Sequence, residues 1–555
     1  MSNEAWLKAE IGFTQYLIQA GRLDAARDSL AALEGPEPVG PIADAWKELG
    51  GAYFSQDRHR EAEAAFRRAL DKFPADDEAR MGLGYALFNQ TRTSEAENCF
   101  KQVAQSAGGN AVAWRALCAT RLNLHDHEGA AKAIARALAL NGKDAETHAL
   151  RGLLAYRKSQ AGRRWRDWTR QNLKDPAARP NLLAGVMDQR ELDDSLRSIQ
   201  DARQIDPRIR TDELGARLLV AMGRPEEALE FLAASPQPDA RSWQLTADVC
   251  WLLRQEDEAR IYLKKSLEAR MFPEPEPRPL EEETLCQARV AAGLNRHKHE
   301  SPSATPLVWV HWDAPAYFSQ SIGSALAASP STPLVILGDS TNAFSPCQHM
   351  PLSRRAASAW AFLERYRHAS ENDFVYEAFC LMRWFFLQDW SCVAGVERLA
   401  AVDSDLLLYC DVERELVPRM KGLDLAFTGE MGPHLALLTS QGLSDLCGFF
   451  MDAYANGAPS IGCQVSDMLL LPHFLKTRRW ADLSQIETGC RVDMNMRLSE
   501  GFCMAGEIKQ VSFRQGQAFA KNRETGLETR LLALHFQGPA KPYMGQALRQ
   551  EDFTV

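Results

Sequence analysis

The sequence predicts two domains of different fold class, an all-α superhelix followed by an α/β domain. In the first half, landmark residues recur at an interval of 34 residues, which is typical of stacked helix pairs. After Thr305 the pattern changes to short apolar runs on either side of a helical segment, which indicates a parallel sheet. We therefore expect a helical domain over residues 1–272, a linker over 273–304 and an α/β domain over 305–555.

The composition is that of a soluble globular protein with more than one core. The chain has 555 residues, of which 45% are hydrophobic, and its net charge of -9 argues against a nucleic-acid partner. No stretch reaches the roughly 18 apolar residues of a transmembrane segment, and the N-terminus lacks the apolar core of a secretory signal. Since the twelve cysteines are scattered without CxxC pairs, we expect a cytoplasmic protein.

The repeat is clearest over residues 46–74. The landmarks of this first copy are Trp46, Leu49, Gly50, Tyr53, Ala62, Phe66, Ala69 and Pro74. Successive shifts of 34 residues reach Leu83, Gly84, Ala96 and Phe100, and then Trp114, Leu117, Ala130 and Ala137. This spacing resembles the tetratricopeptide repeat. Weaker copies cover 1–32, 211–234 and 241–272, whereas 156–210 departs from the pattern.

One helix pair cannot bury its apolar face alone, so the pairs must stack into a superhelix. The resemblance implies a concave groove that binds a partner or acceptor protein. Two alternatives stay open, since the superhelix could pack only against its own second domain or against a second copy in a homo-oligomer.

The second domain opens with a βαβ pattern. The apolar runs PLVWVHW (306–312) and TPLVILGD (332–339) flank the helix candidate SQSIGSALAAS (319–329). Such a unit predicts a parallel sheet whose ligands bind at the carboxyl ends of its strands. Proline-rich sequence over 271–283 separates this domain from the repeats.

A pair of aspartates interrupts the apolar segment RLAAVDSDLLLYCDV (398–412). Two carboxylates within a buried strand are costly unless a cation offsets their charge. Asp403 and Asp405 therefore predict a site for Mn²⁺ or Mg²⁺, because hard oxygen ligands favour these ions. The alternative is a strand cap or surface loop.

Residues 305–545 resemble the GT-A glycosyltransferases, specifically the retaining family that includes glycogenin and lipopolysaccharide galactosyltransferases. Two further segments carry the resemblance. The segment FVYEAFCLMRWFFLQDW (374–390) matches the family helix that carries an arginine, here Arg383. The segment HFQGPAKPY (535–543) follows the family's closing His-Phe-x-Gly-x-x-Lys-Pro-Trp signature, with Tyr543 in place of tryptophan.

The resemblance implies a nucleotide-diphosphate sugar as donor, with UDP as the expected nucleotide. His535 would join the aspartates as a metal ligand, and Lys541 would neutralise the β-phosphate. Gly538 would let the backbone approach a phosphate closely. Arg383 would reach the donor diphosphate or sugar.

Other candidates carry alternatives. Asp467 would touch the donor or acceptor sugar, or serve only as a helix N-cap. Tyr317, which follows the first strand with His311 and Asp313, would stack on the nucleotide base or pack in the core. A final pair, Glu430 and His434, is a candidate for the acceptor side.

Together these features predict a hexosyltransferase that acts on an acceptor hydroxyl with retention of configuration. The repeats suggest that the acceptor is a protein. One alternative is an enzyme of surface polysaccharide or lipopolysaccharide synthesis whose repeats serve assembly. The other is a repeat scaffold with an inactive transferase domain.

Overall fold

The computed structural model divides the chain into two compact units, the first ending at residue 235 and the second beginning at residue 238 among the described positions. Each unit has a hydrophobic core of its own. The structure describes residues 3–33, 40–56, 58–90, 92–106, 110–158, 189–209, 211–235, 238–270, 278–280, 284, 305–352, 356–370, 372–455, 465–487 and 489–553.

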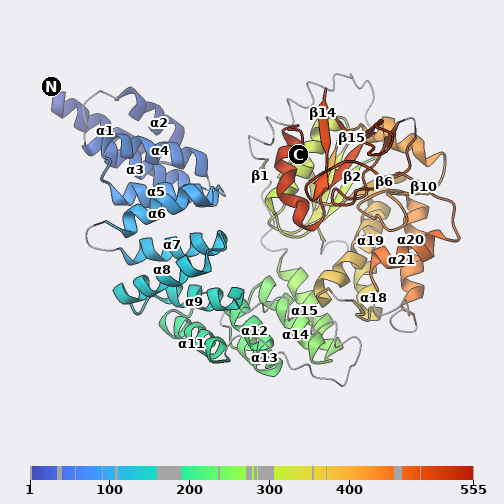
Figure 1. The fold of residues 1–555 in the computed structure, drawn as a ribbon, viewed down its shortest axis with the longest axis horizontal. Coiled ribbons are helices and arrows are strands. Elements are labelled where there is room, and N and C mark those ends of the chain that lie inside the picture. Colours follow the sequence, from blue (N-terminus) through green and yellow to red (C-terminus); the bar gives the residue numbers. More distant parts are fainter. Residues whose placement is uncertain are drawn as a thin grey trace. The chain divides into compact units, whose positions relative to one another are not determined.

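The first unit consists of helices that pack in consecutive pairs (Figure 1). They are α1 (Asn3–Gln19), α2 (Leu23–Ala32), α3 (Gly40–Ser55), α4 (His59–Lys72), α5 (Asp77–Asn89), α6 (Thr93–Ala104), α7 (Ala111–Asn123), α8 (His127–Leu140), α9 (Ala145–Lys158), α11 (Gln189–Ile205), α12 (Asp212–Ala221) and α13 (Pro225–Ala233). This is the all-helical superhelix that the sequence predicts. Most of the departing stretch, 159–188, lies outside the described residues.

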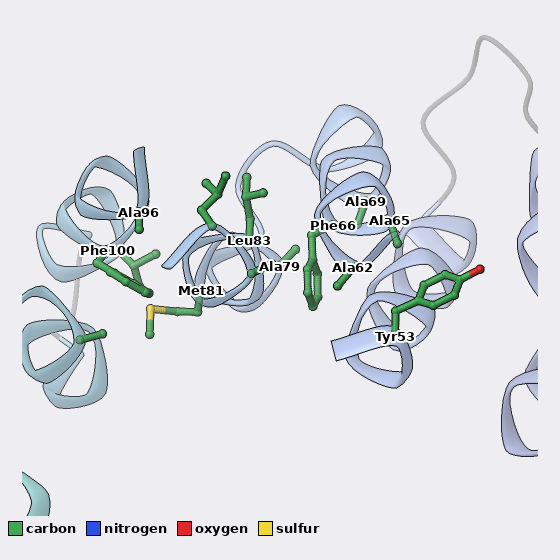
Figure 2. Packing of buried hydrophobic residues seen from close by; sticks show 14 of the residues in the cluster. Tyr53, Ala62, Ala65, Phe66, Ala69, Ala79, Met81, Leu83, Ala96 and Phe100 are labelled. Carbon is green, nitrogen blue, oxygen red and sulfur yellow. The ribbon is translucent and has the colours of Figure 1, made fainter. Parts of the chain in front are cut away.

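Glycines facing phenylalanines explain why the helices of this unit pack so closely. Figure 2 shows the two rings, Phe66 and Phe100, among the buried side chains of the repeats. A Cβ atom added at Gly50 would lie 2.8 Å from the ring of Phe66. At Gly84 it would lie 2.5 Å from the ring of Phe100, one repeat further along the chain. Both rings are buried, Phe100 with only 1% exposure. The repeated glycine therefore provides the space that the repeated aromatic ring fills.

Within the described residues, the main sheet of the second unit has seven strands. They are β2 (Leu307–Val310), β3 (Leu334–Gly338), β5 (Gln348–Pro351), β6 (Arg398–Val402), β8 (Leu425–Phe427), β9 (Leu435–Thr439) and β10 (Ala481–Asp482). Their order is β10-β8-β9-β6-β2-β3-β5. The expected βαβ unit is present, since β2 and β3 pair in parallel on either side of α17 (Ala316–Ala328). The sheet is mixed rather than purely parallel, because β9 runs antiparallel to both of its neighbours.

Shorter strands form smaller sheets. They are β1 (Arg278–Pro279), β4 (Phe344–Ser345), β7 (Leu406–Leu408), β11 (Cys490–Arg491), β12 (Met504–Ala505), β13 (Ile508–Lys509), β14 (Val511–Arg514), β15 (Gln517–Lys521), β16 (Glu528–Leu531) and β17 (Ala533–His535). Four of them form a sheet in the order β11-β16-β15-β14. The pair β7 and β17 is antiparallel and joins the aspartate segment to the end of the chain.

Helices and single turns complete the second unit. They are α14 (Ala240–Leu252), α15 (Glu256–Ala269), α18 (Ala357–Arg365), α19 (Phe374–Ala394), α20 (Ser440–Ala453), α21 (Asp467–Leu475), α22 (Met544–Leu548), η2 (Val412–Leu416), η3 (Val417–Met420) and η4 (Gly538–Tyr543). The longest of these is α19, with 21 residues, and most of its side chains are buried. Among the described residues, no helix has the length and apolar character that a membrane span requires.

The helices α14 and α15 belong to the second unit, whereas the sequence places residues 241–272 with the repeats. Their polar side chains explain the difference. The carboxylate of Asp248 on α14 accepts a hydrogen bond of 3.0 Å from the backbone N–H of Val375, in the first turn of α19. On α15, the Arg260 guanidinium donates to the carbonyl of Tyr366 at 3.3 Å. A helical pattern alone contains no sign of these long-range contacts.

Candidate metal centre

Strand pairing brings the two predicted aspartates and the predicted histidine together. Asp403 follows the last residue of β6, and Asp405 precedes β7. His535 ends β17 and pairs with Leu406 in the antiparallel register of β7 and β17. One ligand atom from each of Asp403, Asp405 and His535 lies within 4.8 Å of the others. This spacing allows all three side chains to coordinate a single cation.

The orientation of His535 suits a metal ligand. Its Nδ1 lies 2.8 Å from the carbonyl oxygen of Met494, to which it donates when protonated at that nitrogen. This tautomer leaves Nε2 unprotonated and 3.5 Å from a carboxylate oxygen of Asp405. A carbonyl that fixes the second imidazole nitrogen is the usual support of a metal-binding histidine. Two carboxylates and one imidazole suit Mn²⁺, and Mg²⁺ is the alternative for the carboxylates.

Opposing electrostatic effects act on the two acidic ligands. Burial raises the pKa of the Asp403 carboxyl, and the nearby charge of Arg383 offsets this only in part. Burial acts in the same direction on Asp405, but its interactions with His535 and Lys541 outweigh burial and lower its pKa. Burial would lower the pKa of His535, but the nearby Asp405 carboxylate outweighs burial and raises it. The carboxyl of Asp405 therefore loses its proton more readily than that of Asp403.

Arg383 lies between two carboxylates. Its guanidinium, on α19, donates to a carboxylate oxygen of Asp403 at 2.5 Å and to one of Asp467 at 2.7 Å. The sequence placed this arginine near a donor diphosphate. In the structure both of its terminal nitrogens bind aspartates, and one of these, Asp403, is a candidate metal ligand. The Nε of Arg383 is buried without a hydrogen-bond partner among the described atoms. Arg383 therefore offsets the negative charge of the centre.

Asp467 is not the N-cap of α21. Ser466 fills that position, because its hydroxyl accepts a hydrogen bond from the backbone N–H of Leu469. The Asp467 side chain is 6% exposed and accepts hydrogen bonds from Arg383 and from the indole of Trp384. The carboxylate thus faces the centre, although the sequence left its role open.

Lys541, Gly538 and Tyr317 form one edge of the centre. The Lys541 ammonium, in η4, lies 3.2 Å from the second carboxylate oxygen of Asp405. It also lies 4.4 Å from the centre of the Tyr317 ring, at the start of α17. Gly538 has a φ of 60°, in the left-handed region where glycine is favoured. Tyr317 is half-buried: it packs against a hydrophobic cluster of the second unit and also contacts the lysine directly.

His434 lies next to the candidate metal ligand His535, a position that the sequence did not predict. Its ring stacks on that of His535 with centroids 3.9 Å apart and is 3% exposed. Burial, reinforced by the neighbouring imidazole, lowers the pKa of His434 well below its usual value. The proposed acceptor role for His434 is therefore wrong, since its side chain is covered. Glu430, its companion in that expectation, is exposed in the turn between β8 and β9.

The sequence did not predict a buried ionic cluster next to His535. Lys509 and Asp493 are fully buried and form an ion pair with each other, and Glu500 also pairs with Lys509. Asp493 precedes the Met494 carbonyl that orients His535, and its carboxylate accepts a long hydrogen bond from the backbone N–H of His535. Lys509 ends strand β13, whereas Asp493 and Glu500 lie in connecting segments, so no strand pattern in the sequence indicates their burial.

Comparison with known proteins finds a family match within the first unit. The tetratricopeptide repeat family model matches residues 15–77 and 48–111. The N-terminal region carries tetratricopeptide repeats. These matches lie within the first unit and cover less than half of the chain. A comparison with curated proteins finds no match.

Solved structures resemble the repeat region at low identity. A tetratricopeptide repeat protein from Parabacteroides merdae is 16% identical, with a TM-score of 0.36, over 48% of this chain and 94% of that one. A thermophilic TPR protein from Thermus thermophilus is 19% identical, with a TM-score of 0.29, over 38% of this chain and 99% of that one. The Cut9–Hcn1 hetero-tetramer of APC/C is 14% identical, with a TM-score of 0.34, over 46% of this chain and 45% of that one.

Proposed function

We propose that the second unit is a metal-dependent glycosyltransferase of the GT-A kind that transfers a hexosyl group from a UDP-sugar to an acceptor hydroxyl. The observation that carries the proposal is the group of Asp403, Asp405 and His535, whose ligand atoms lie within 4.8 Å of one another. Its place after β6 supports the proposal, because ligands of open α/β sheets bind beyond the carboxyl ends of the strands. The resemblance of residues 305–545 to the retaining family extends the proposal to retention of configuration.

Each side chain of the centre has a distinct part in this reaction. Bound Mn²⁺ or Mg²⁺ would neutralise the donor diphosphate as negative charge develops on the leaving group. Lys541 adds a positive charge beside Asp405, where it can bind a phosphate oxygen. Gly538 leaves open space on the same turn, because nothing lies within 4 Å of the position that a Cβ atom would take. Arg383 holds Asp403 and Asp467 in place and keeps the site from becoming too negative.

We propose that the repeats recruit the acceptor, and that the acceptor is a protein. A groove on the first unit supports this, since it has a volume of about 750 Å³ and is lined by residues of α5, α7, α9 and α12. Its lining combines apolar side chains such as Leu150 and Leu153 with the charged Arg115 and Glu146. A peptide with alternating apolar and charged residues matches this lining.

The experiment that tests the function is turnover of UDP-sugars with Mn²⁺ by the full chain. Asp405→Ala should lower turnover by at least about a hundredfold, because the strongest anionic ligand of the centre is lost. Asp452→Ala is the matched control, since Asp452 is exposed on α20, and it should keep wild-type turnover. Equal turnover by wild type and Asp405→Ala would refute the metal assignment.

A thermal-shift screen identifies the donor independently of turnover. In the presence of Mn²⁺, a donor at 100 times its Kd should stabilise the folded protein by about 2.7 kcal/mol. No shift with any nucleotide sugar would favour the alternative of a repeat scaffold with an inactive second unit.

A further inference from the structure

A second polar cluster lies at the carboxyl ends of β2 and β3. Arg270, which caps α15, directs its guanidinium to Asp313 at 2.7 Å and to Gln244 at 2.8 Å. Asp339, which follows β3, lies 3.7 Å from the same guanidinium. Arg270 is 7% exposed, and its Nε is buried with no hydrogen-bond partner in the described part of the structure. The helix pair α14 and α15, which resembles a repeat, thus holds the Arg270 guanidinium at the carboxyl ends of the strands.

The backbone at Asp313 is constrained so that its side chain faces outward. Its φ is 62°, in the left-handed region, and its N–H donates to Asp339 at 2.8 Å. Asp339 itself is 1% exposed and also accepts from the N–H and hydroxyl of Thr341, so its carboxylate is held inside the protein. The Asp313 side chain is 39% exposed, and only its Oδ1 is bound by Arg270. Its Oδ2 makes no hydrogen bond to any described residue and remains available as an acceptor.

The cluster is continuous with the metal centre. The ring of His311, two residues before Asp313, has its centroid 4.8 Å from that of Phe318, whose neighbour Tyr317 contacts Lys541 of the metal centre. The charges of Asp313, Asp339, Lys541 and Asp405 all act on the pKa of this imidazole. Burial lowers the pKa of His311 to about 4, so the ring is neutral near pH 7. Its Nε2 is buried without a partner among the described atoms. A ligand bound at the metal centre would therefore extend from Lys541 past His311 toward Asp313.

We propose that Arg270 is a positioning residue for the nucleoside half of the donor, which it serves by fixing the Asp313 carboxylate as an acceptor. The inference rests on the proposed function. The N–H groups of a base and the hydroxyls of a ribose are the donors that such a carboxylate binds. If the ion pair between Arg270 and Asp313 served only to attach α15 to the sheet, the second carboxylate oxygen of Asp313 would not need to face outward. The left-handed backbone at this residue would then have no structural role.

The test compares the binding of UDP and of inorganic pyrophosphate to the full chain in saturating Mn²⁺. Asp313→Asn is the decisive variant, because asparagine tolerates the left-handed backbone. Arg270 would bind the amide oxygen, which turns the amide N–H₂ toward the ligand, where an acceptor is needed. We expect UDP to bind about tenfold or more weakly while pyrophosphate binding is unchanged.

Arg270→Lys keeps the positive charge next to buried Asp339 but cannot bridge Asp313 and Gln244, so it should show the same selective loss. Arg530→Lys is the matched control, since Arg530 pairs with Glu415 elsewhere in the same unit, and it should bind both probes as the wild type does. Equal UDP binding by wild type and Asp313→Asn would overturn the inference, as would an equal loss for pyrophosphate. Failure of the wild-type chain to bind either probe would instead overturn the proposed function, and the inference with it.

Discussion

Glu377→Gln should change how the stability of the second unit depends on pH. Glu377 lies in the first turn of α19, the helix that carries Arg383, and it is 1% exposed. Burial raises the pKa of its carboxyl from 4.5 to about 7. One carboxylate oxygen accepts hydrogen bonds from Ser370 and Asn372, while the other is buried without a described partner.

The sign follows from the raised pKa. In the folded state the carboxyl keeps its proton up to about pH 7, whereas in the unfolded chain it loses the proton above about 4.5. Its contribution to stability is therefore full below pH 4.5 and is lost as the pH rises to 7. A shift of this size corresponds to about 3 kcal/mol. Glutamine keeps an oxygen for Ser370 and Asn372 but has no charge, so it should not show this loss.

Hydrogen exchange of α19 peptides in a urea series measures the free energy of unfolding of this unit. Between pH 5 and pH 8, the free energy of unfolding of Glu377→Gln relative to wild type should rise by about 2.5 kcal/mol. Glu364→Gln, at an exposed position on α18, is the control and should give the same difference at both pH values. If Glu377→Gln behaves like this control, the carboxyl is not buried in the manner described.

Two further predictions concern the repeats and the metal centre. Gly84→Ala should destabilise the repeats by about 1–3 kcal/mol in thermal unfolding, because its Cβ would lie 2.5 Å from the ring of the facing phenylalanine. Gly51→Ala, with nothing within 4 Å, should instead stabilise them by up to about 1 kcal/mol, and a similar loss in both would contradict the packing argument. Lys541→Met should strengthen binding of free Mn²⁺ about three- to tenfold, as measured by electron paramagnetic resonance, because a cation 3.2 Å from Asp405 is removed. The same variant should weaken UDP binding, whereas Lys421→Met, at a lysine whose side chain is 66% exposed, should change neither.

The sequence predicts those features that are encoded locally or by period. Gly84 and Phe100 follow Gly50 and Phe66 at a constant interval, so the stacked helices were predictable from the repeat alone. The end of β6 at the aspartate pair was also predictable, because an apolar run leads directly into the two charged residues. His535 is 130 residues from Asp405 and could be associated with it only through the motif at the end of the chain.

Contacts between distant segments were beyond the sequence. Nothing in the helical pattern of α14 indicates that Asp248 binds the first turn of α19, because the two residues in contact are 127 positions apart. The burial of His434 under His535 depends on how β9 and β17 are placed, and a lone histidine gives no sign of it. The left-handed backbone of Asp313 is likewise held by a hydrogen bond to Asp339, which follows another strand.

The attachment of α14 and α15 to the second unit limits how this protein could have evolved by recombination. Repeat arrays commonly gain or lose whole helix pairs, since each pair contacts only its neighbours. Loss of α14 and α15 would remove Asp248 from the start of α19 and Arg270 from Asp339, whose carboxylate would remain buried. Gene fusions that exchange the repeats would therefore be tolerated only with a crossover before residue 240, even though the proline-rich segment after residue 270 looks like the natural joint.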